Sequence, residues 1–505
     1  MQVVKSAKTG SIFGNLFLLL LIFLIPNFFV QIFFVSRAYG MHKNNHKSTN
    51  NIFVDTSGKL CQKEIKYIKK RKPVVKKSQE QLTGKKLSKC PTIGMPFSGG
   101  GYRAFVAMLG FMLGAKQIGL LGSTTYISGL SGSAWGIGTL LARNAFYKKK
   151  KGFLKKFKQD MQDRMSKSFW NFKQVNWQEI IKRLAKKYKN YGKIEPADLW
   201  GALVVDRLMG DLPQSGQNLS FKNIRSFLKK TDKYPYPLFS LIMKDTFDKT
   251  EHYEPFEVTP NSSGSDYLHG FVPTKYFGSE FKDGKLTKRR SQESLGFNFG
   301  LFGSPYDFNE GDLLLQIVDA IPQTFKFKTE VDSFVRFIIK KYKLSKKNFL
   351  PSKVNNPTYN MKTSSYKKEF LTLADAGFEF NLTIPPLLRR KPNIIVCCDA
   401  SSDACEKGFP ELVIAKEYAD KNGFAFPSLK YYKKISANLF IFKWDKSKKT
   451  NKKIPAILYF TNPISESTFK LEYSKKEFNK LCDSMKKMVI KHKDTIAKEI
   501  IEKSL

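Results

Sequence analysis

Two turns rich in glycine and serine carry residue types suited to acyl transfer. The first reads SGGGYRA at 98–104 and the second GLSGSAW at 129–135, each between a short apolar run that favours a strand and an apolar run that favours a helix. Successive glycines let the backbone turn sharply, and the N–H groups at a helix N-terminus favour negative charge. We therefore predict that Gly100 and Gly101 donate to an oxyanion. A phosphate-binding loop is the weaker alternative, because GxGxxG and GxxxxGK[ST] are both missing.

The second turn supplies a candidate nucleophile. GLSGS, at 129–133, resembles the nucleophile elbow GxSxG, in which small neighbours tolerate the strained turn that exposes a serine. It departs from the strict pattern because Ser133 takes the place of the last glycine. We predict that Ser131 is the nucleophile.

A general base is needed beside this serine. None of the chain's five histidines lies in a recognisable motif, so a Ser-His-Asp triad is poorly supported; they are His42, His46, His252, His269 and His492. The segment LADAGFEFN, at 373–381, contains Asp375 in a small, glycine-flanked turn. Asp375 is therefore the candidate base of a Ser-Asp dyad, although an isolated DAG also suits an ordinary turn.

Charge and cysteine content narrow the function classes. The 505 residues include 87 Lys and Arg against 43 Asp and Glu, a net charge of +44. The electrostatic field of such a positive charge attracts anionic membranes, nucleic acid or acidic partners. A general bias of the sequence toward lysine explains the net charge equally well. Six cysteines in a chain of this length do not indicate a disulfide framework. Without a CxxC pair or a histidine cluster, we expect no metal and no cofactor.

The N-terminal region suggests a membrane location. Residues 12–35 are almost wholly apolar, and a spanning helix needs about 20 such residues. We expect a single span within residues 1–40; the alternative is a secreted form, cleaved near the small residues at 35–38. The lysine-rich residues 41–89 are expected to form a solvated tether or a surface helix resting on anionic headgroups. The region lacks interleaved aromatic residues, so no nucleic-acid partner is expected.

The remaining chain alternates between strand-like and helix-like segments. Strands are predicted at 393–398, 438–442 and 456–460, and a terminal helix within 466–505. This alternation predicts a three-layer α/β fold with a central, mainly parallel sheet. We expect the catalytic domain at 90–465, with cap elements within 147–300. The segment KKKKGFLKKFK, at 148–158, suits either a membrane-surface patch or a solvated helix face.

A family resemblance joins these motifs. SGGGYRA, GLSGSAW and LADAGFEFNLTIPPLLRRKPNIIVCCDAS (373–401) resemble the catalytic domain of the cytosolic phospholipase A2 and phospholipase B (lysophospholipase) family, patatin-like hydrolases with a Ser-Asp dyad. The resemblance spans roughly residues 90–460. It implies that Ser131 is the nucleophile, Asp375 the base, and Gly100 and Gly101 the oxyanion hole. It also implies that Arg103 contacts the substrate phosphate; a structural salt bridge is the alternative for Arg103.

The expected activity is hydrolysis of glycerophospholipid acyl esters through an acyl-enzyme, by a membrane-associated phospholipase or lysophospholipase. Its partners are the phospholipid substrate and an anionic membrane surface, and calcium recruitment is not expected. Transacylation on the same fold is one alternative. An inactive protein that holds anionic lipid is another, and the intact Ser131 and Asp375 argue against it. Acyl position, headgroup and oligomeric state stay open.

Overall fold

A computed structural model describes residues 52–505, except 147–151, 170, 172–173, 248–249, most of 305–351, 402–407, 444–453, 465 and 469. The apolar residues 12–35 and part of the basic segment at 148–158 therefore lie outside the described residues. Within the described part of the chain, no helix is both long enough and apolar enough to cross a membrane.

The described strands build one large sheet with a parallel centre and antiparallel flanks. Its centre runs β14-β11-β1-β2-β3, with each neighbouring pair parallel. β12 and β13 continue it antiparallel on one side, and β4, β5 and β6 on the other, while β10 pairs with β3 and β9. The bounds are β1 Ile93–Pro96, β2 Tyr126–Gly129, β3 Tyr236–Phe247, β4 Thr250–Val258, β5 Ser262–Ser265, β6 Gly270–Pro273, β9 Ser352–Asn355, β10 Phe370–Asp375, β11 Ile394–Asp399, β12 Tyr432–Ser436, β13 Leu439–Phe442 and β14 Ala456–Thr461.

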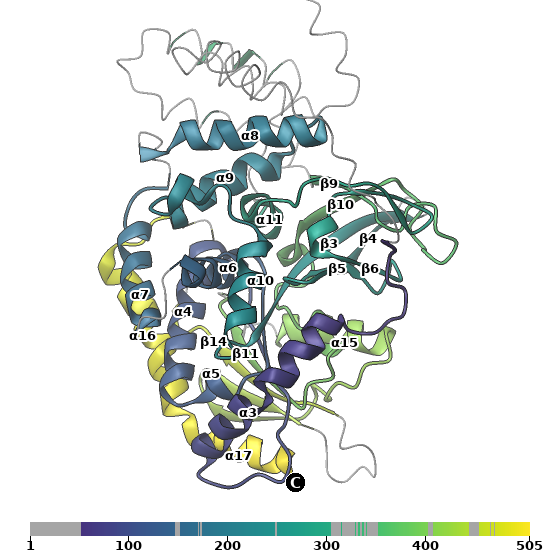
Figure 1. The fold of residues 1–505 in the computed structure, drawn as a ribbon. Helices are drawn as coiled ribbons and strands as arrows, with labels where there is room; N and C mark the ends of the chain where they lie inside the picture. The colour runs from purple at the N-terminus through teal and green to yellow at the C-terminus, as the bar shows by residue number, and fades with distance from the viewer. Residues whose placement is uncertain are drawn as a thin grey trace, which may run out of the picture.

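Helices cover both faces of the parallel centre, as the expected three-layer α/β fold requires. In β11, Val396 and Cys398 face the larger apolar core, whereas Ile395 and Cys397 face a smaller one. Both faces of a parallel strand are buried, which explains the uninterrupted apolar run of β11. α4, α6 and α16 lie on the side of the larger core and α15 on the other (Figure 1). Their bounds are α4 Gly101–Gln117, α6 Ser131–Phe146, α15 Pro410–Lys421 and α16 Lys475–Lys491.

The region expected to hold cap elements is mixed. Helices α8 and α9 lie above the sheet in the view of Figure 1, α11 lies just below α9, and α7 and α10 lie lower, at the level of α6. By contrast, residues 236–273 contribute β3 to β6 to the main sheet itself, and β7 and β8 form a separate hairpin. The bounds are α7 Phe153–Met165, α8 Trp177–Tyr191, α9 Pro196–Met209, α10 Phe221–Lys230, α11 Leu295–Phe302, β7 Glu280–Lys282 and β8 Lys285–Lys288.

Within the described part of the lysine-rich region 41–89, residues 62–83 form a helix on the surface. α3 (Gln62–Thr83) packs against the short helix α5 (Leu120–Ser123) and against α17 (Lys493–Ser504), which follows α16. Arg71 of α3 is fully buried and donates from Nη2 to the backbone oxygens of Leu121 at 3.1 Å and Thr124 at 3.0 Å. The helix is thus part of the folded body of the protein.

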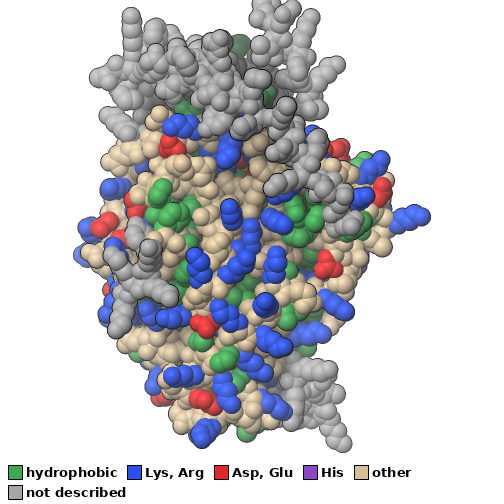
Figure 2. Space-filling model, viewed as in Figure 1, with side chains coloured by type: hydrophobic (Ala, Val, Ile, Leu, Met, Phe, Trp, Pro, Cys, Tyr) green, Lys and Arg blue, Asp and Glu red, His purple; other side chains and the backbone are tan. Residues whose placement is uncertain are grey.

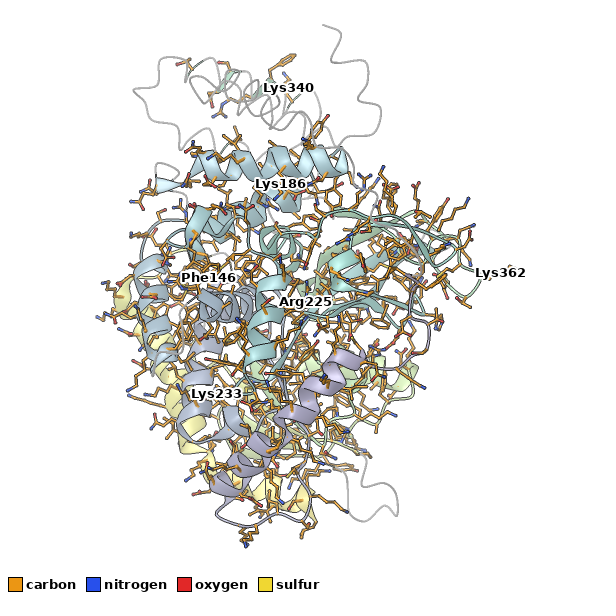
Figure 3. All side chains as sticks on the ribbon, viewed as in Figure 1. Phe146, Lys186, Arg225, Lys233, Lys340 and Lys362 are labelled. Carbon is orange, nitrogen blue, oxygen red and sulfur yellow. The ribbon has the colours of Figure 1, made fainter. Side chains whose placement is uncertain are left out.

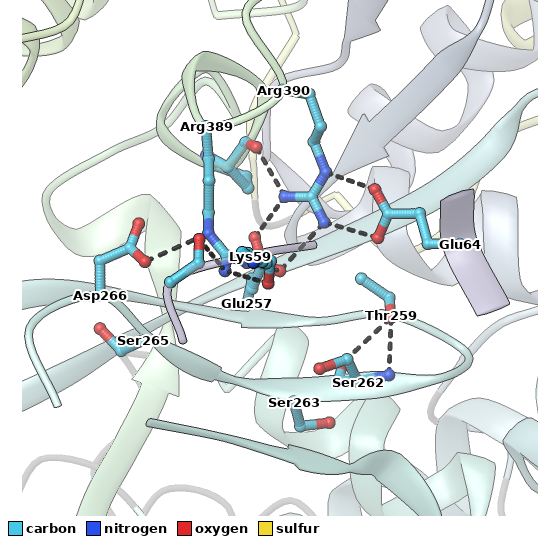
Figure 4. A network of polar contacts seen from close by, with 12 residues as sticks. Lys59, Glu64, Glu257, Thr259, Ser262, Ser263, Ser265, Asp266, Arg389 and Arg390 are labelled. Atoms are coloured by element: carbon cyan, nitrogen blue, oxygen red, sulfur yellow. Dashed lines mark hydrogen bonds and ion pairs between the residues drawn. The ribbon is translucent and has the colours of Figure 1, made fainter. Parts of the chain in front are cut away.

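A buried ionic network fixes the start of α3 to the segment that follows the short helix α14 (Pro385–Leu388) (Figure 4). Arg390 forms a two-pronged bond with Glu64, from Nε to Oε1 and from Nη2 to Oε2, both at 2.9 Å. The same guanidinium bonds Glu257 of β4 through Nη1 at 2.5 Å and Nη2 at 3.0 Å. Glu64 and Arg390 are both buried, so each charge depends on its partners.

Candidate active site

Ser131 stands at the sharp turn between β2 and α6. β2 ends at Gly129 and α6 begins at Ser131 itself. The φ angle of Ser131 is +47°, a left-handed backbone conformation that residues other than glycine rarely adopt. A Cβ atom on Gly132 would lie 1.7 Å from the backbone oxygen of Gly101, so only glycine fits after the serine. The turn therefore has the strained, crowded geometry of a nucleophile elbow.

Ser133, which departs from the strict elbow motif, links the two glycine-rich turns. Its Oγ donates to the backbone oxygen of Ser98 at 2.6 Å. The substitution of serine for the last glycine of the motif thus adds a bond that holds the elbow against the 98–101 loop.

Asp375 meets Ser131 at the end of β10. The Ser131 hydroxyl lies close enough to the Asp375 carboxylate to favour its charged form, and the Gly377 N–H donates to Oδ1 at 2.9 Å. Asp375 is only 6 % exposed. Burial raises the pKa of Asp375 to about 7, against the smaller opposing effects of the Gly377 N–H and the Ser131 hydroxyl. A carboxyl group with this pKa can hold or release a proton near neutral pH.

The described histidines are placed elsewhere. His252 pairs across the β3–β4 hairpin with Asp245, near the turn and away from Leu241, the partner of Asp375 in the sheet. His492 follows α16, and its Nε2 lies 3.1 Å from Ser436 Oγ. His269 is in the turn before β6. None of these three histidines therefore has a contact with Ser131 or Asp375 among the hydrogen bonds of the described residues.

Gly100 and Gly101 lie at the start of α4, against the serine. Their φ angles are +122° and +53°, which favour glycine. A Cβ atom on the preceding Gly99 would lie 3.1 Å from the Cβ of Ser131, so the loop and the elbow are in contact. The first N–H groups of a helix have no partner within it. This arrangement can therefore present backbone donors to negative charge that develops next to Ser131.

Arg103 covers the same loop from the first turn of α4. Its side chain is 4 % exposed, and Nη1 donates to the backbone oxygen of Glu466 at 2.7 Å. A Cβ atom on Gly100 would lie 2.6 Å from Nη2 of Arg103. The guanidinium is thus held beside the glycine loop, where it can act on an anionic group bound there.

Asn381 is a site residue that the sequence analysis missed. Its Oδ1 accepts from the Gly99 N–H at 3.1 Å, and its Nδ2 donates to Ser401 Oγ at 3.0 Å. A Cβ atom on Gly377 would lie 3.2 Å from this same Oδ1 and 3.4 Å from Oδ1 of Asp375. Asn381 therefore ties the glycine loop to the turn that carries Asp375. A usable signal was its polar side chain at the end of the LADAGFEFN motif, before an apolar run.

An apolar cluster flanks Ser131 and Asp375. Leu130, Ile242, Ala374, Ala376 and Phe380 form one buried cluster, against which the side chains of Tyr253, Ile414 and Tyr418 pack. Apolar surroundings of this kind strengthen the electrostatic interactions of a buried charged group. Among the described residues, no group of three or more His, Cys, Asp and Glu side chains is placed to hold a metal ion.

Comparisons with known proteins identify a family and a fold. Residues 93–420 match the model of the family described as the lysophospholipase catalytic domain. The chain is 31% identical to mouse (Mus musculus) cytosolic phospholipase A2 gamma over 254 residues, which cover 49% of this chain and 39% of that protein. It is 24% identical to lysophospholipase 2 of Candida albicans over 436 residues, 77% of this chain and 70% of that protein.

The fold has a counterpart among solved structures. Human GIVD cytosolic phospholipase A2 superimposes with a TM-score of 0.71 at 18% identity, over 90% of this chain and 66% of that one. The match to the mouse gamma protein covers 39% of its length, and the match to the mouse epsilon protein covers 31%. The chain therefore spans well under half the length of these relatives.

Proposed function

The chain belongs to the lysophospholipase catalytic domain family, and from this premise we propose that it hydrolyses acyl esters of glycerophospholipids through a Ser131–Asp375 dyad. The placement of Ser131 beside a buried carboxylate whose pKa is raised to about 7 is the observation that carries the proposal. It joins a strained serine to a base of suitable strength without a histidine.

Ser131 Oγ attacks the ester carbonyl carbon while Asp375 takes the hydroxyl proton. The carbonyl oxygen becomes an oxyanion, which accepts hydrogen bonds from the N–H groups of Gly100 and Gly101. When the tetrahedral intermediate collapses, Asp375 returns the proton to the leaving alcohol and an acyl-enzyme remains. Water then attacks the acyl-enzyme with Asp375 again as base, which releases fatty acid and restores Ser131.

Arg103 would position the substrate through its phosphate. A guanidinium can bond two phosphate oxygens at once, and this one lies next to the proposed oxyanion donors. The alternative of a purely structural Arg103 is supported by its bond to the Glu466 backbone. The two roles differ in their effect on substrates that lack phosphate.

The enzyme is proposed to work at a membrane. The support is the apolar stretch at 12–35, long enough for one span, together with the net charge of +44. Extraction of membranes with alkaline carbonate tests the span, because a spanning protein stays in the pellet and a peripheral one is released. Recovery of a soluble protein whose N-terminus lies near residue 38 would instead show signal cleavage.

Product analysis tests the activity. Purified protein is incubated with a phospholipid that carries a different label in each acyl chain, and the products are separated. Release of labelled fatty acid supports hydrolysis, while label that moves to a second lipid or alcohol shows transacylation. Ser131→Ala and Asp375→Asn serve as controls, and label released equally by all three proteins would exclude the dyad.

A further inference from the structure

The outer face of α3 carries only positive charge. Tyr67, Arg71 and Val75 are buried on the inner side of this helix. Its seven exposed lysines are Lys63, Lys66, Lys69, Lys70, Lys72, Lys76 and Lys77. The helix has two acidic residues. Glu64 is buried against Arg390, and Glu80 is half-buried and accepts from the Leu87 N–H. No exposed acid therefore interrupts the lysines.

Helix α10 extends this face. Lys70 Nζ donates to the backbone oxygen of Lys229 at 3.0 Å, which joins the two helices. Further exposed lysines follow on and after α10, namely Lys222, Lys229, Lys230 and Lys233. Figure 2 shows Lys and Arg side chains gathered over α10 and α3, and Figure 3 labels Arg225 and Lys233 at this place. We call the exposed lysines of α3 and α10, with Lys233, the lysine face; Asp232, which is half-buried, is the acid beside it.

A general bias toward lysine does not explain the lysine face. Other surface helices mix both signs: α16 contains Glu477 and Asp483, and Lys158 pairs with Asp483 at 2.9 Å. Among the ion pairs of the described residues, none involves the seven α3 lysines. Like charges three or four residues apart destabilise a helix. The buried contacts of Glu64 and Arg71 hold α3 in place despite this repulsion.

We propose that the lysine face is a docking surface for anionic lipid headgroups. The proposal rests on the proposed function to the extent that the substrate is membrane lipid. Besides its lysines, the exposed side of α3 presents Ile65, which is 41 % exposed, and Pro73, but no aromatic side chain. Single-stranded nucleic acid is held by aromatic platforms on which bases stack, so lipid headgroups fit this surface better.

The rigid attachment of α3 gives the docking a consequence. Because Arg390 holds the start of the helix, a bilayer bound to the lysine face fixes the orientation of the whole catalytic domain. The apolar residues 12–35 precede α3 in the chain, so a membrane that takes up this stretch brings headgroups to the helix. Each lysine near an anionic surface strengthens binding by about fivefold. At an ionic strength of about 0.1 M, salt limits this attraction to distances of about 10 Å.

Amine labelling of the full chain tests the proposal. The protein is mixed with phosphatidylcholine vesicles, or with vesicles that also contain phosphatidylserine, and acetylated briefly with a water-soluble reagent. We expect the anionic vesicles alone to slow acetylation of the lysine face by fivefold or more, and high salt to abolish the protection. Lys476, Lys480, Lys487 and Lys491, exposed on α16, should be unaffected.

Matched variants test the cause. K66Q/K69Q/K76Q/K77Q should remove the protection of Lys229, Lys230 and Lys233, whereas K476Q/K480Q/K487Q/K491Q removes the same charge from α16 and should preserve it. Equal protection on α3 and α16, or protection that survives the first variant, would overturn the proposal. So would protection by single-stranded RNA but not by anionic vesicles. The labelling needs no hydrolysis, so an inactive protein that still shows the pattern would contradict the proposed function alone.

Discussion

The Ser131 hydroxyl lies beside the Asp375 carboxylate, which is 6 % exposed at the end of β10, and favours its charged form. The two residues come from segments far apart in the chain, and the bonds of Ser133 and Asn381 to the 98–101 loop hold them against the proposed oxyanion donors.

Removal of the carboxylate should stop turnover. Asp375→Asn keeps the shape of the side chain but cannot take the serine proton, so we expect kcat to fall by roughly a thousandfold or more. Circular dichroism checks that the variant is folded. His252→Ala and His269→Ala should each keep most of the activity, since neither histidine has a role in the dyad. A folded but inactive histidine variant would contradict the mechanism.

The rate should depend on the ionisation of Asp375. Because its pKa is raised to about 7, kcat/KM should rise with pH through this value and level off above it. A profile of kcat/KM from pH 5 to 9 measures this directly. If the acidic limb falls instead near pH 4, the carboxylate is not buried as described.

Stability should show the opposite dependence on pH. The pKa of Asp375 is raised from 3.8 to about 7, so its contribution to stability is present below pH 4 and is lost as pH rises through 7. Asp375→Asn removes this cost, and its free energy of unfolding relative to the wild type should increase from pH 4 to pH 8 by up to about 4 kcal/mol. Urea unfolding at both pH values provides the comparison, and a difference that does not vary with pH would argue against a buried ionisable group.

Arg103→Lys separates recognition of phosphate from a structural role. Lysine keeps the charge but loses the two-pronged geometry, so turnover of phospholipid should fall roughly tenfold to a hundredfold. Hydrolysis of a neutral ester without phosphate should fall much less. Equal losses on both substrates, or a large drop in thermal stability, would indicate that Arg103 mainly holds the Glu466 backbone.

The ionic network of α3 should be needed for stability. Glu64→Gln leaves Arg390 buried with Glu257 as its remaining carboxylate, and we expect a loss of about 3 kcal/mol in the free energy of unfolding. Lys63→Gln, on the exposed side of the same turn, is the matched control and should change little. For the same reason, a chain that starts at Lys89 should be less stable than the full chain. Identical urea midpoints for both point variants would show that the network contributes nothing.

Local sequence signals were sufficient for part of the fold and site. The glycines next to Ser131 predicted the elbow, because a crowded turn requires them. Uninterrupted apolar runs predicted β11 and β14. Contacts between distant segments gave no local signal. The bond from the Gly99 N–H to Asn381 and the pair of Glu64 with Arg390 each join residues hundreds of positions apart. In the sequence, Asn381, Glu64 and Arg390 therefore looked like ordinary polar residues. The antiparallel strands β4, β5 and β6 looked like cap elements because they lack the apolar run of a buried parallel strand.

Covalent labelling of the nucleophile tests the central claim most directly. A fluorophosphonate reacts with a serine only when that serine is activated, and peptide mass spectrometry identifies the modified residue. We predict a single adduct on Ser131, which Ser131→Ala abolishes and Asp375→Asn greatly slows, in parallel with hydrolysis. An adduct on Ser98 or Ser133, or hydrolysis that persists in Ser131→Ala, would contradict the account.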